Sequence, residues 1–361
     1  MSTASQRTSE RDFYAVILAG GSGERFWPLS TLDRPKQFLD LERTGRSLLR
    51  ATFERLLGVT EDATRIFVVT AARYRALVQE QLPELAAESL LVEPTARDTA
   101  PAIALAALEL ERRFGSVVMG LFPSDHRVAD ADAYGTVMRR AIWQATETRG
   151  LLTVGVRPSY AATGYGYIQV GEGAAGGAYR VSRFVEKPDA DRAKEYLSSA
   201  RYYWNSGMFL WRSDVILGEL ERFLPEVAGP LRRAHERGEV DGVFPTLPKI
   251  SIDYAVLERT DRAYVIPGEF GWDDLGSWSA LERLYRGTEA NTVFGAHEGA
   301  GSSGNIVYAG GAEDLIVTLG VTDLVIVKCG DIVLVARKGN AEDVKQLMPR
   351  LLGRQASRSD R

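Results

Sequence analysis

The sequence predicts an α/β protein with a Rossmann-like, mostly parallel sheet, followed by a small β-rich appendage. Two observations support this fold class. In the first half, short apolar runs of strand length alternate with helical patterns, which is typical of a parallel sheet covered on both faces. After about residue 291, short β-rich runs dominate. Ligands of such parallel sheets bind beyond the carboxyl ends of the strands, so we look for chemistry directly after each strand.

The alternating patterns assign the elements of the first half. The predicted strands are Tyr14–Leu18, Arg65–Thr70, Leu90–Val92, Val117–Phe122 and Leu151–Val156. The predicted helices are Ser47–Leu57, Arg73–Leu82, Thr99–Arg113 and Tyr134–Glu147. From Gly164 to about Trp278 the strands become less regular and aromatic residues cluster, which we interpret as the acceptor-binding half of the same domain.

The C-terminal part is predicted from short β-rich runs. These are Asn305–Tyr308, Leu315–Leu319, Leu324–Val327 and Ile332–Ala336, with a last helix at Ala341–Leu352. Gly299–Gly304 is predicted to be a linker. The predicted domains are a larger domain over 1–290, with halves at about 13–160 and about 161–290, a β-rich domain over 291–352, and a disordered tail over 353–361.

Composition excludes several classes of function. The chain has 44 basic and 48 acidic residues, so no basic excess exists to hold a nucleic acid. Cys329 is the only cysteine, which excludes an intrachain disulfide and a thiolate metal site and fits a cytoplasmic protein. We expect no membrane span, because the longest apolar runs are strand-length or are broken by charges. The N-terminus is polar and holds no apolar signal-peptide core.

A glycine-rich loop directly after the first strand is the strongest functional motif. Glycines let the backbone approach a triphosphate, and successive N–H groups form an anion nest. Arg25 can add a bidentate phosphate contact, and Lys36 a second fixed charge once the loop folds back. The candidate nucleotide-binding residues of this loop are Ala19, Gly20, Gly21, Gly23, Arg25 and Lys36. The spacing is neither the Walker pattern nor GxGxxG, and the alternative is a glycine-rich turn with surface charges.

The whole string resembles a known family. Leu-Ala-Gly-Gly-x-Gly-x-Arg-x-Trp-Pro-Leu-Ser, with Pro-Lys-Gln-Phe after it, is similar to the mannose-1-phosphate guanylyltransferases (GDP-mannose pyrophosphorylases), in their short bacterial form without a fused isomerase domain. The resemblance runs from Tyr14 to about Trp278 and more weakly to the end. It implies that Arg25 and Lys36 hold the triphosphate, although Glu24 stands where many relatives carry Thr. It also implies a left-handed β-helix-like appendage, which in the family often supports homodimer contacts.

The segment Glu93–Ala102 follows the third predicted strand. In similar guanylyltransferases this segment faces the guanine, commonly with Asn where Asp98 stands, so the resemblance places Pro94 and Asp98 in the base pocket. A carboxylate suits guanine because it can accept from both the ring N–H and the exocyclic amine. The alternative is that Asp98 or Thr99 is the N-cap of the next helix, and the sequence leaves this open.

Two distant aspartates are the candidate ligands of a Mg²⁺ cofactor. Asp125 follows the fourth predicted strand, in Pro-Ser-Asp-His, and Asp274 lies in Gly-Trp-Asp-Asp-Leu-Gly. Magnesium prefers one or two carboxylates with substrate phosphates and water. Both residues match the metal-binding aspartates of the family that the chain resembles. His126 is interpreted as a supporting residue, since the three histidines of the chain have no zinc-ligand spacing.

Three short motifs in the second half match the family's sugar-phosphate pocket in order and spacing. The resemblance thus makes 1–290 a catalytic domain, with about 13–160 as its nucleotide half and about 161–290 as its sugar-phosphate half. Alone, the three motifs are commonplace: a hairpin turn, a surface ion pair and a buried turn. The resemblance implies that Glu186, Lys187 and Asn205 hold the sugar phosphate, and that Asp253 is a further contact or lies just behind it. Gly166 offers a place where a sugar could press on the backbone. Lys187 is the candidate phosphate contact and joins Arg25 and Lys36 in the predicted catalytic set.

The resemblance implies transfer of GMP from GTP to α-D-mannose 1-phosphate. The attacking phosphate is already an anion, so positioning and charge neutralisation would supply most of the catalysis. Alternatives are a related enzyme that uses another nucleoside triphosphate or sugar 1-phosphate, and a nucleotide-sensing regulatory protein. A dehydrogenase is disfavoured by the loop spacing.

Overall fold

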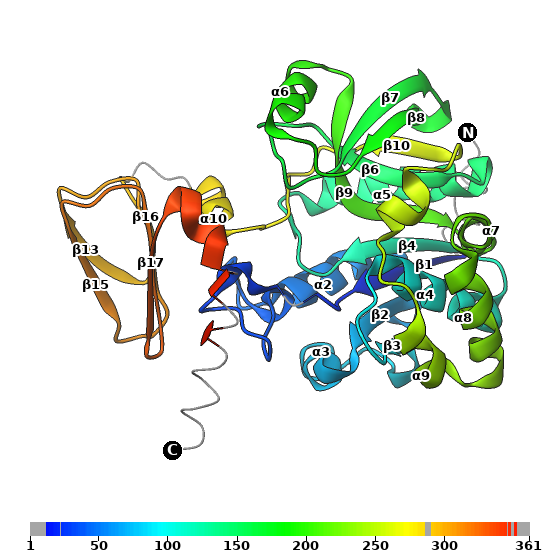
Figure 1. Cartoon of the computed structure of the whole chain (residues 1–361), viewed down its shortest axis with the longest axis horizontal. Helices are drawn as coiled ribbons and strands as arrows, with labels where there is room; N and C mark the ends of the chain where they lie inside the picture. The colour runs from blue at the N-terminus through cyan, green and yellow to red at the C-terminus, as the bar shows by residue number, and fades with distance from the viewer. Residues whose placement is uncertain (1–11, 22, 286–289, 345, 348–349, 352–361) are drawn as a thin grey trace. The chain divides into compact units, whose positions relative to one another are not determined.

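The computed structural model describes residues 12–21, 23–285, 290–344, 346–347 and 350–351. Its contacts divide the chain into two compact units (Figure 1). The first unit comprises Met1–Gly20 and Leu49–Trp272, and the second comprises Gly21–Leu48 and Asp273–Arg361. These contact-based units are not the same as the predicted domains, 1–290 and 291–352. The predicted domain boundaries remain a proposal.

The first unit is built on one mixed sheet. Its strands are β1 (Phe13–Leu18), β2 (Ile66–Ala71), β3 (Leu90–Glu93), β4 (Val118–Pro123), β6 (Leu151–Val156), β7 (Tyr167–Gly173), β8 (Tyr179–Val185), β9 (Tyr202–Arg212) and β10 (Ala263–Pro267). The strand order is β3-β2-β1-β4-β9-β6-β10-β8-β7. The two-residue strands β5 (Arg127–Val128) and β11 (Trp272–Asp273) form a separate two-stranded sheet.

Parallel pairing covers the N-terminal part of this sheet. Strands β3, β2, β1 and β4 are parallel neighbours, as their strand–helix alternation predicts. The sequence pattern also predicts β6 as the next parallel strand, but β9 lies between β4 and β6 and runs antiparallel to both. The physical reason is that β9 is buried on both faces, so its aromatic run fits the middle of the sheet.

Helices cover this sheet on its two faces. They are α2 (Leu48–Thr60), α3 (Arg75–Gln81), α4 (Thr99–Phe114), α5 (Ala131–Thr148), α6 (Ala190–Ser198), α7 (Ser213–Phe223), α8 (Pro225–Arg237) and α9 (Val240–Val243). Helix α5 packs on β4, β6, β9 and β10, whereas α4, α7 and α8 pack on one another (Figure 1). Helix α4 is rich in Ala and Leu, which favours helix, and it ends at Gly115 with φ 73°.

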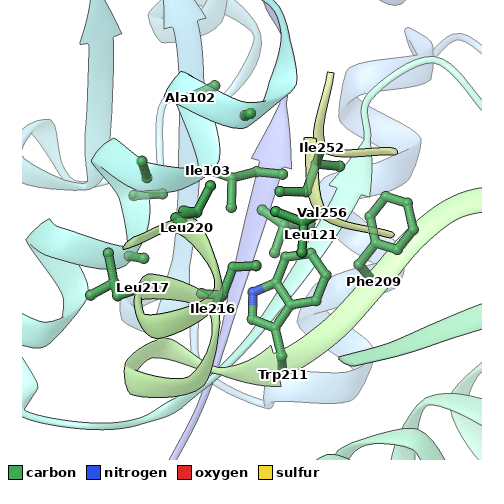
Figure 2. Packing of buried hydrophobic residues seen from close by; sticks show 14 of the residues in the cluster. Ala102, Ile103, Leu121, Phe209, Trp211, Ile216, Leu217, Leu220, Ile252 and Val256 are labelled. Carbon is green, nitrogen blue, oxygen red and sulfur yellow. The ribbon is translucent and has the colours of Figure 1, made fainter. Parts of the chain in front are cut away.

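The main hydrophobic core joins α4, α7, β4 and β9 with the π-helix Asp253–Leu257 (Figure 2). Trp211 of β9 is fully buried and lies beside Ile216 of α7. Leu220 of α7 and Val256 of the π-helix enter the same cluster. This core therefore supports the segment that carries Asp253.

The second unit holds a β-helical array. Its strands are β12 (Thr292–Phe294), β13 (Ala296–Ala300), β14 (Ile306–Ala309), β15 (Leu315–Leu319), β16 (Leu324–Cys329) and β17 (Ile332–Arg337), and its helix is α10 (Trp278–Leu284). Strands β12, β14 and β16 pair in parallel in one sheet, and β13 and β15 pair in parallel in another. Strand β17 returns antiparallel to β16. The predicted β-rich appendage is confirmed.

Two predictions in this part need comment. The linker predicted at Gly299–Gly304 is wrong, because Gly299 and Ala300 belong to β13 and Ser303 bridges Thr322. Its glycines lie at turns between the strands of the array instead. Gly301 and Gly304 have φ of 61° and 68°, which glycine adopts readily. The predicted last helix begins as a 3-10 helix over Lys338–Asp343, and its end lies partly outside the described residues, as does the predicted tail 353–361.

The segment after the glycine loop packs into the second unit. Phe26, Leu39 and Leu41 are buried in one hydrophobic cluster with Trp278 of α10 and Val325 of β16. The segment that follows the glycine loop therefore shares a hydrophobic cluster with the C-terminal array. Within the described residues, we find no helix that is both long and apolar enough to cross a bilayer.

Leu220→Ala should destabilise the first unit strongly, because Leu220 is fully buried in its main core. A cavity-forming Leu→Ala change costs about 2–5 kcal/mol. The matched control is Leu197→Ala at the end of α6, where the side chain is 38% exposed and the loss should stay below about 1 kcal/mol. Urea unfolding measures both free energies, and equal losses would contradict this assignment of the core.

Candidate active site

The first half of the glycine loop is fixed to the end of the sheet. Ala19 N–H donates to the Val69 carbonyl at 2.8 Å, and the buried Thr70 hydroxyl donates to the Ala19 carbonyl at 3.0 Å. A Cβ on Gly20 would lie 3.0 Å from Glu93 Oε2. The backbone after β1 is thus held against the end of β3 by groups that leave little room for a side chain at position 20.

The second half of the loop is folded against the Pro-Lys-Gln motif inside the second unit. Gly23 has φ 53°, and a Cβ there would lie 2.7 Å from both Cβ and N of Lys36. Gln37 Nε2 donates to the Gly21 carbonyl at 2.9 Å. The structure therefore places Gly21, Gly23 and Lys36 together. Arg25 lies in the 3-10 helix Glu24–Phe26 that follows the glycines and is half-buried.

Lys36 also reaches the second acidic motif. Its Nζ donates to the backbone carbonyl of Asp274 at 2.5 Å, although the two residues are 238 positions apart. Lys36 is only 5% exposed, so its ammonium is held in a defined position. The structure thus joins the glycine loop, its cation and the Asp274 turn through direct hydrogen bonds.

Aromatic packing stabilises the residues that follow the glycine loop. The Phe26 and Trp278 rings lie 5.2 Å apart, and Trp278 Nε1 donates to the Trp27 carbonyl at 3.4 Å. Trp278 also contacts Tyr308 of β14, with ring centroids 5.5 Å apart. Because Trp278 is fully buried, it ties the residues after the glycine loop to the β-helical array.

The two adjacent aspartates of the second motif have different surroundings. Asp273 forms an ion pair with Arg283 at 3.0 Å and accepts from Leu275 N–H. Asp274 Oδ1 accepts from Gly276 N–H at 3.0 Å, and a Cβ on Gly276 would lie 2.7 Å from Asp274 Oδ2. The geometry explains why a glycine follows at this point and agrees with the choice of Asp274 over Asp273.

Asp125 lies at the carboxyl end of β4 in the first unit. Ser124 N–H donates to the Leu18 carbonyl at 3.2 Å, which brings the residues after β4 beside the end of β1. The Asp125 side chain is about one third exposed (34%). His126, next to it, lies with its Nε2 3.8 Å from Asp125 Oδ1. The carboxylate is thus presented at the sheet edge where ligands of this fold class bind.

The base segment follows β3. Asp98 accepts from Thr99 N–H at 2.8 Å and is the N-cap of α4, so the capping alternative is realised in the structure. Asp98 is exposed and has φ 68°. Pro94 is half-buried directly after the strand. Recognition of a base by Asp98 remains a proposal.

Glu93 is a candidate that the sequence reasoning passed over. It is 5% exposed, and its Oε1 has no hydrogen-bond partner among the described residues. Burial, and then the nearby Asp98 charge, raises the pKa of Glu93 to about 7. A buried polar atom without a partner carries a desolvation cost, which a hydrogen bond from a ligand would offset. Glu93 is therefore a candidate ligand contact. The available signal was a carboxylate at the end of an apolar strand.

The predicted sugar-phosphate residues come together in the first unit. Asn205 Nδ2 donates to Asp253 Oδ1 at 2.9 Å, and Asn205 N–H donates to the Gly166 carbonyl at 2.8 Å. A Cβ on Gly166 would lie 2.5 Å from Glu186 Oε2. Lys187 Nζ donates to Glu186 Oε1 at 2.8 Å. These five residues, drawn from four separate motifs, form one polar cluster.

Further contacts orient this cluster. Thr153 Oγ1 and Gly207 N–H donate to Asn205 Oδ1, at 3.2 and 3.1 Å, so the amide orientation of Asn205 is fixed. Burial, followed by the Glu186 charge, raises the pKa of Asp253 to about 7. Glu258 Oε1, which the sequence reasoning missed, accepts from Glu186 N–H at 3.2 Å. No motif marks Glu258, because its role depends on the turn that follows the π-helix.

Comparisons with known proteins agree with this geometry. The family model described as nucleotidyl transferase matches residues 14–291. The chain belongs to the nucleotidyl transferase family. A second model, described as a MannoseP isomerase/GMP-like beta-helix domain, matches residues 297–351. The family assignment predicted from the glycine loop is therefore confirmed, as is a β-helix in the C-terminal part.

Named relatives cover most of the chain. It is 39% identical over 360 residues to a mannose-1-phosphate guanylyltransferase of Escherichia coli, covering 95% of this chain and 74% of the relative. It is 40% identical to the xanthan biosynthesis protein XanB of Xanthomonas campestris, covering 97% and 75%. A solved structure from Thermus thermophilus, titled mannose-1-phosphate geranyltransferase, has 37% identity and a TM-score of 0.87 over 94% of this chain and 99% of its own.

Gly23→Ala should destabilise the second unit, because the residue has a left-handed backbone and a Cβ would collide with Lys36. The left-handed conformation alone costs about 1–2 kcal/mol for a non-glycine residue. Gly21→Ala is the matched control, since a Cβ there meets nothing within 4 Å. Thermal unfolding of the two variants without substrate checks this, and a Gly21→Ala loss as large as that of Gly23→Ala would contradict it.

Glu93→Gln should change the pH dependence of stability. The folded protein keeps a proton on Glu93 up to about pH 7, whereas the unfolded chain releases it near the ordinary pKa of 4.5. The free energy of unfolding of the unmodified protein therefore falls as pH rises between these values, by up to about 3 kcal/mol. The Gln variant lacks this loss, so its relative stability should rise from pH 4.5 to 8. Chemical unfolding at several pH values measures the difference, and a flat difference would refute the assigned pKa.

Proposed function

We propose that this chain transfers GMP from GTP to α-D-mannose 1-phosphate, giving GDP-mannose and pyrophosphate. Family membership establishes a nucleotidyltransferase, and relatives at about 39% identity are named for the mannose-1-phosphate reaction. The observation that carries the proposal is the contact set of Lys36, which packs on Gly23 and binds the Asp274 carbonyl. It supports the interpretation of three distant motifs as parts of one triphosphate site.

The buried carboxyl of Glu93 supports a guanine base. Its Oε1 is without a partner among the described residues, and Glu93 is the last residue of β3, directly before the segment that leads to α4. Guanine presents a ring N–H and an exocyclic amine side by side, and one ionised carboxylate can accept both. Binding of the base would therefore favour the ionised form of Glu93 and lower its pKa from about 7. Adenine has no such pair of donors. We therefore assign base recognition to Glu93, with Asp98 close enough for its charge to raise the pKa of Glu93.

The donor set fits a hard divalent cation. Nucleotidyltransferases of this family generally use a divalent metal, and we propose Mg²⁺. Asp125 and Asp274 supply carboxylate oxygens, which Mg²⁺ prefers. Among the described residues, no group of three or more His, Cys, Asp or Glu is arranged to hold a metal. Because magnesium usually keeps substrate phosphates and water as ligands, we propose that these complete its coordination. The bound ion would neutralise charge on the triphosphate.

The residues of the chain then perform positioning and charge neutralisation. An oxygen of the sugar phosphate attacks the α-phosphorus of GTP, a new P–O bond forms, and the bond to the β-phosphate breaks to release pyrophosphate. The attacking oxygen is already anionic near neutral pH, so no general base is required. Arg25 and Lys36 offset charge on the triphosphate, while Lys187, oriented by Glu186, brings the second anion close. The Asn205–Asp253 pair presents fixed polar groups to the sugar hydroxyls.

Pyrophosphate release should require GTP, mannose 1-phosphate and Mg²⁺ together. Asp125→Asn and Asp274→Asn should each lower kcat by about 100-fold or more, because each removes charge from the metal site while keeping the side-chain shape. Asp132→Asn, at an exposed position in the first turn of α5, is the control and should retain activity.

The same assay tests the substrate assignment. Replacing GTP by ATP or UTP, or mannose 1-phosphate by glucose 1-phosphate, should lower kcat/KM. Equal rates with glucose 1-phosphate would contradict the sugar assignment, and full activity of either folded metal-site variant would contradict the metal assignment.

A further inference from the structure

A hydrogen bond between two ring nitrogens connects Trp272 with His126. Trp272 Nε1 donates to His126 Nδ1 at 3.2 Å. The two rings meet edge to face, with centroids 5.4 Å apart and an interplanar angle of 87°. Trp272 is itself packed against the Tyr165 and Trp204 rings, at 5.4 and 6.3 Å. The donor is therefore held by an aromatic cluster of the first unit.

This bond determines where the proton of His126 lies. An indole N–H is only ever a donor, so the nitrogen that faces it must be the acceptor. His126 Nδ1 therefore carries no proton, and the neutral ring carries its proton on Nε2. The orientation of one ring thus selects one of the two tautomers of the other.

The protonated nitrogen faces Asp125. His126 Nε2 lies 3.8 Å from Asp125 Oδ1, which is too long for a direct hydrogen bond but close enough for the N–H dipole to act on the carboxylate. In the other tautomer a lone pair would face the carboxylate oxygen and repel it. The selected tautomer therefore presents the ring edge that Asp125 favours.

The surroundings of His126 limit the freedom of its ring. Arg55 Nη2 donates to the His126 carbonyl at 3.4 Å, which fixes the backbone after β4. Gly207 of β9 has φ 71° and lies near the ring, since a Cβ there would be at the ordinary contact distance of 3.7 Å from His126 Cε1. The His126 side chain is 14% exposed, so burial restricts the imidazole.

We propose that Trp272 fixes His126 as the Nε2–H tautomer, and that His126 is a positioning residue that orients the Asp125 carboxylate for the divalent cation. The proposal rests on the proposed function for the role of Asp125. It adds two side chains that act through Asp125 without touching substrate, in the manner by which outer partners of metal ligands fix the orientation of those ligands.

Nitrogen NMR of the metal-free full-length protein tests the tautomer directly. The chain has three histidines, so His→Gln variants at each position assign the ring signals. We expect His126 to be protonated at Nε2 and bare at Nδ1, and we expect Trp272→Phe to give a mixture of both forms, because the phenyl ring lacks the donor. Protonation at Nδ1 in the unmodified protein, or an unchanged tautomer in Trp272→Phe, would overturn the proposal.

Two substitutions of His126 separate the two ring nitrogens. The amide nitrogen of Gln lies near the position of Nε2, and that of Asn near Nδ1. His126→Gln should keep the half-saturating Mg²⁺ concentration within about 3-fold of the unmodified enzyme, whereas His126→Asn should raise it about 10-fold. Thermal unfolding of both variants checks that they are equally folded. Equal Mg²⁺ responses of Gln and Asn variants would refute the positioning role.

These experiments distinguish the inference from the function on which it depends. If the unmodified enzyme shows no Mg²⁺-dependent pyrophosphate release, the proposed function fails, while the NMR result still decides whether Trp272 selects the tautomer. If the enzyme is Mg²⁺-dependent but both His126 variants respond as it does, the function stands and the positioning role is refuted.

Discussion

The hydrogen bond from Lys36 Nζ to the Asp274 carbonyl is the contact on which the candidate nucleotide site depends. It joins a segment near the start of the chain to one near its end, and it is buried beneath the glycine loop. An ammonium held in this way keeps a fixed position without losing side-chain entropy when a phosphate arrives. The conformational entropy of the Lys36 side chain is lost during folding, when the packing of Phe26 against Trp278 offsets this loss.

This arrangement changes the role of the β-helical array. The array contributes no predicted catalytic side chain from its own strands, but its buried residues Val325 and Ile306 share a core with Leu39 and Leu41 of the segment that carries Lys36. Arg43 lies over the Phe294 and Tyr308 rings and adds cation–π contacts to the same packing. The array therefore stabilises, by packing, the segment that carries Lys36 and that we propose to bind the triphosphate.

Much of this architecture could be predicted from residue patterns. The parallel strands β1 to β4 have continuous apolar runs. Gly20, Glu93 and Asp125 lie at or just after the ends of three of them, and a parallel sheet brings such strand ends to one edge. The position of β9 could not be predicted, since antiparallel insertion depends on contacts with strands far away in sequence. Glu93 and Glu258 were missed for a related reason. Their importance comes from burial or from a backbone partner, which a linear motif does not reveal.

Strand β9 has one end in the polar sugar cluster and the other in the main hydrophobic core. Asn205 lies near its start, and Trp211 near its end packs against α7 (Figure 2). Because one continuous backbone carries both, the proposed sugar-phosphate pocket has little freedom to shift independently of the interior. In evolutionary terms, a lineage changing its preferred sugar would meet an inherited constraint here. Substitutions in peripheral turns could adjust the pocket, while any change that moved Asn205 would have to be compatible with the packing of Trp211.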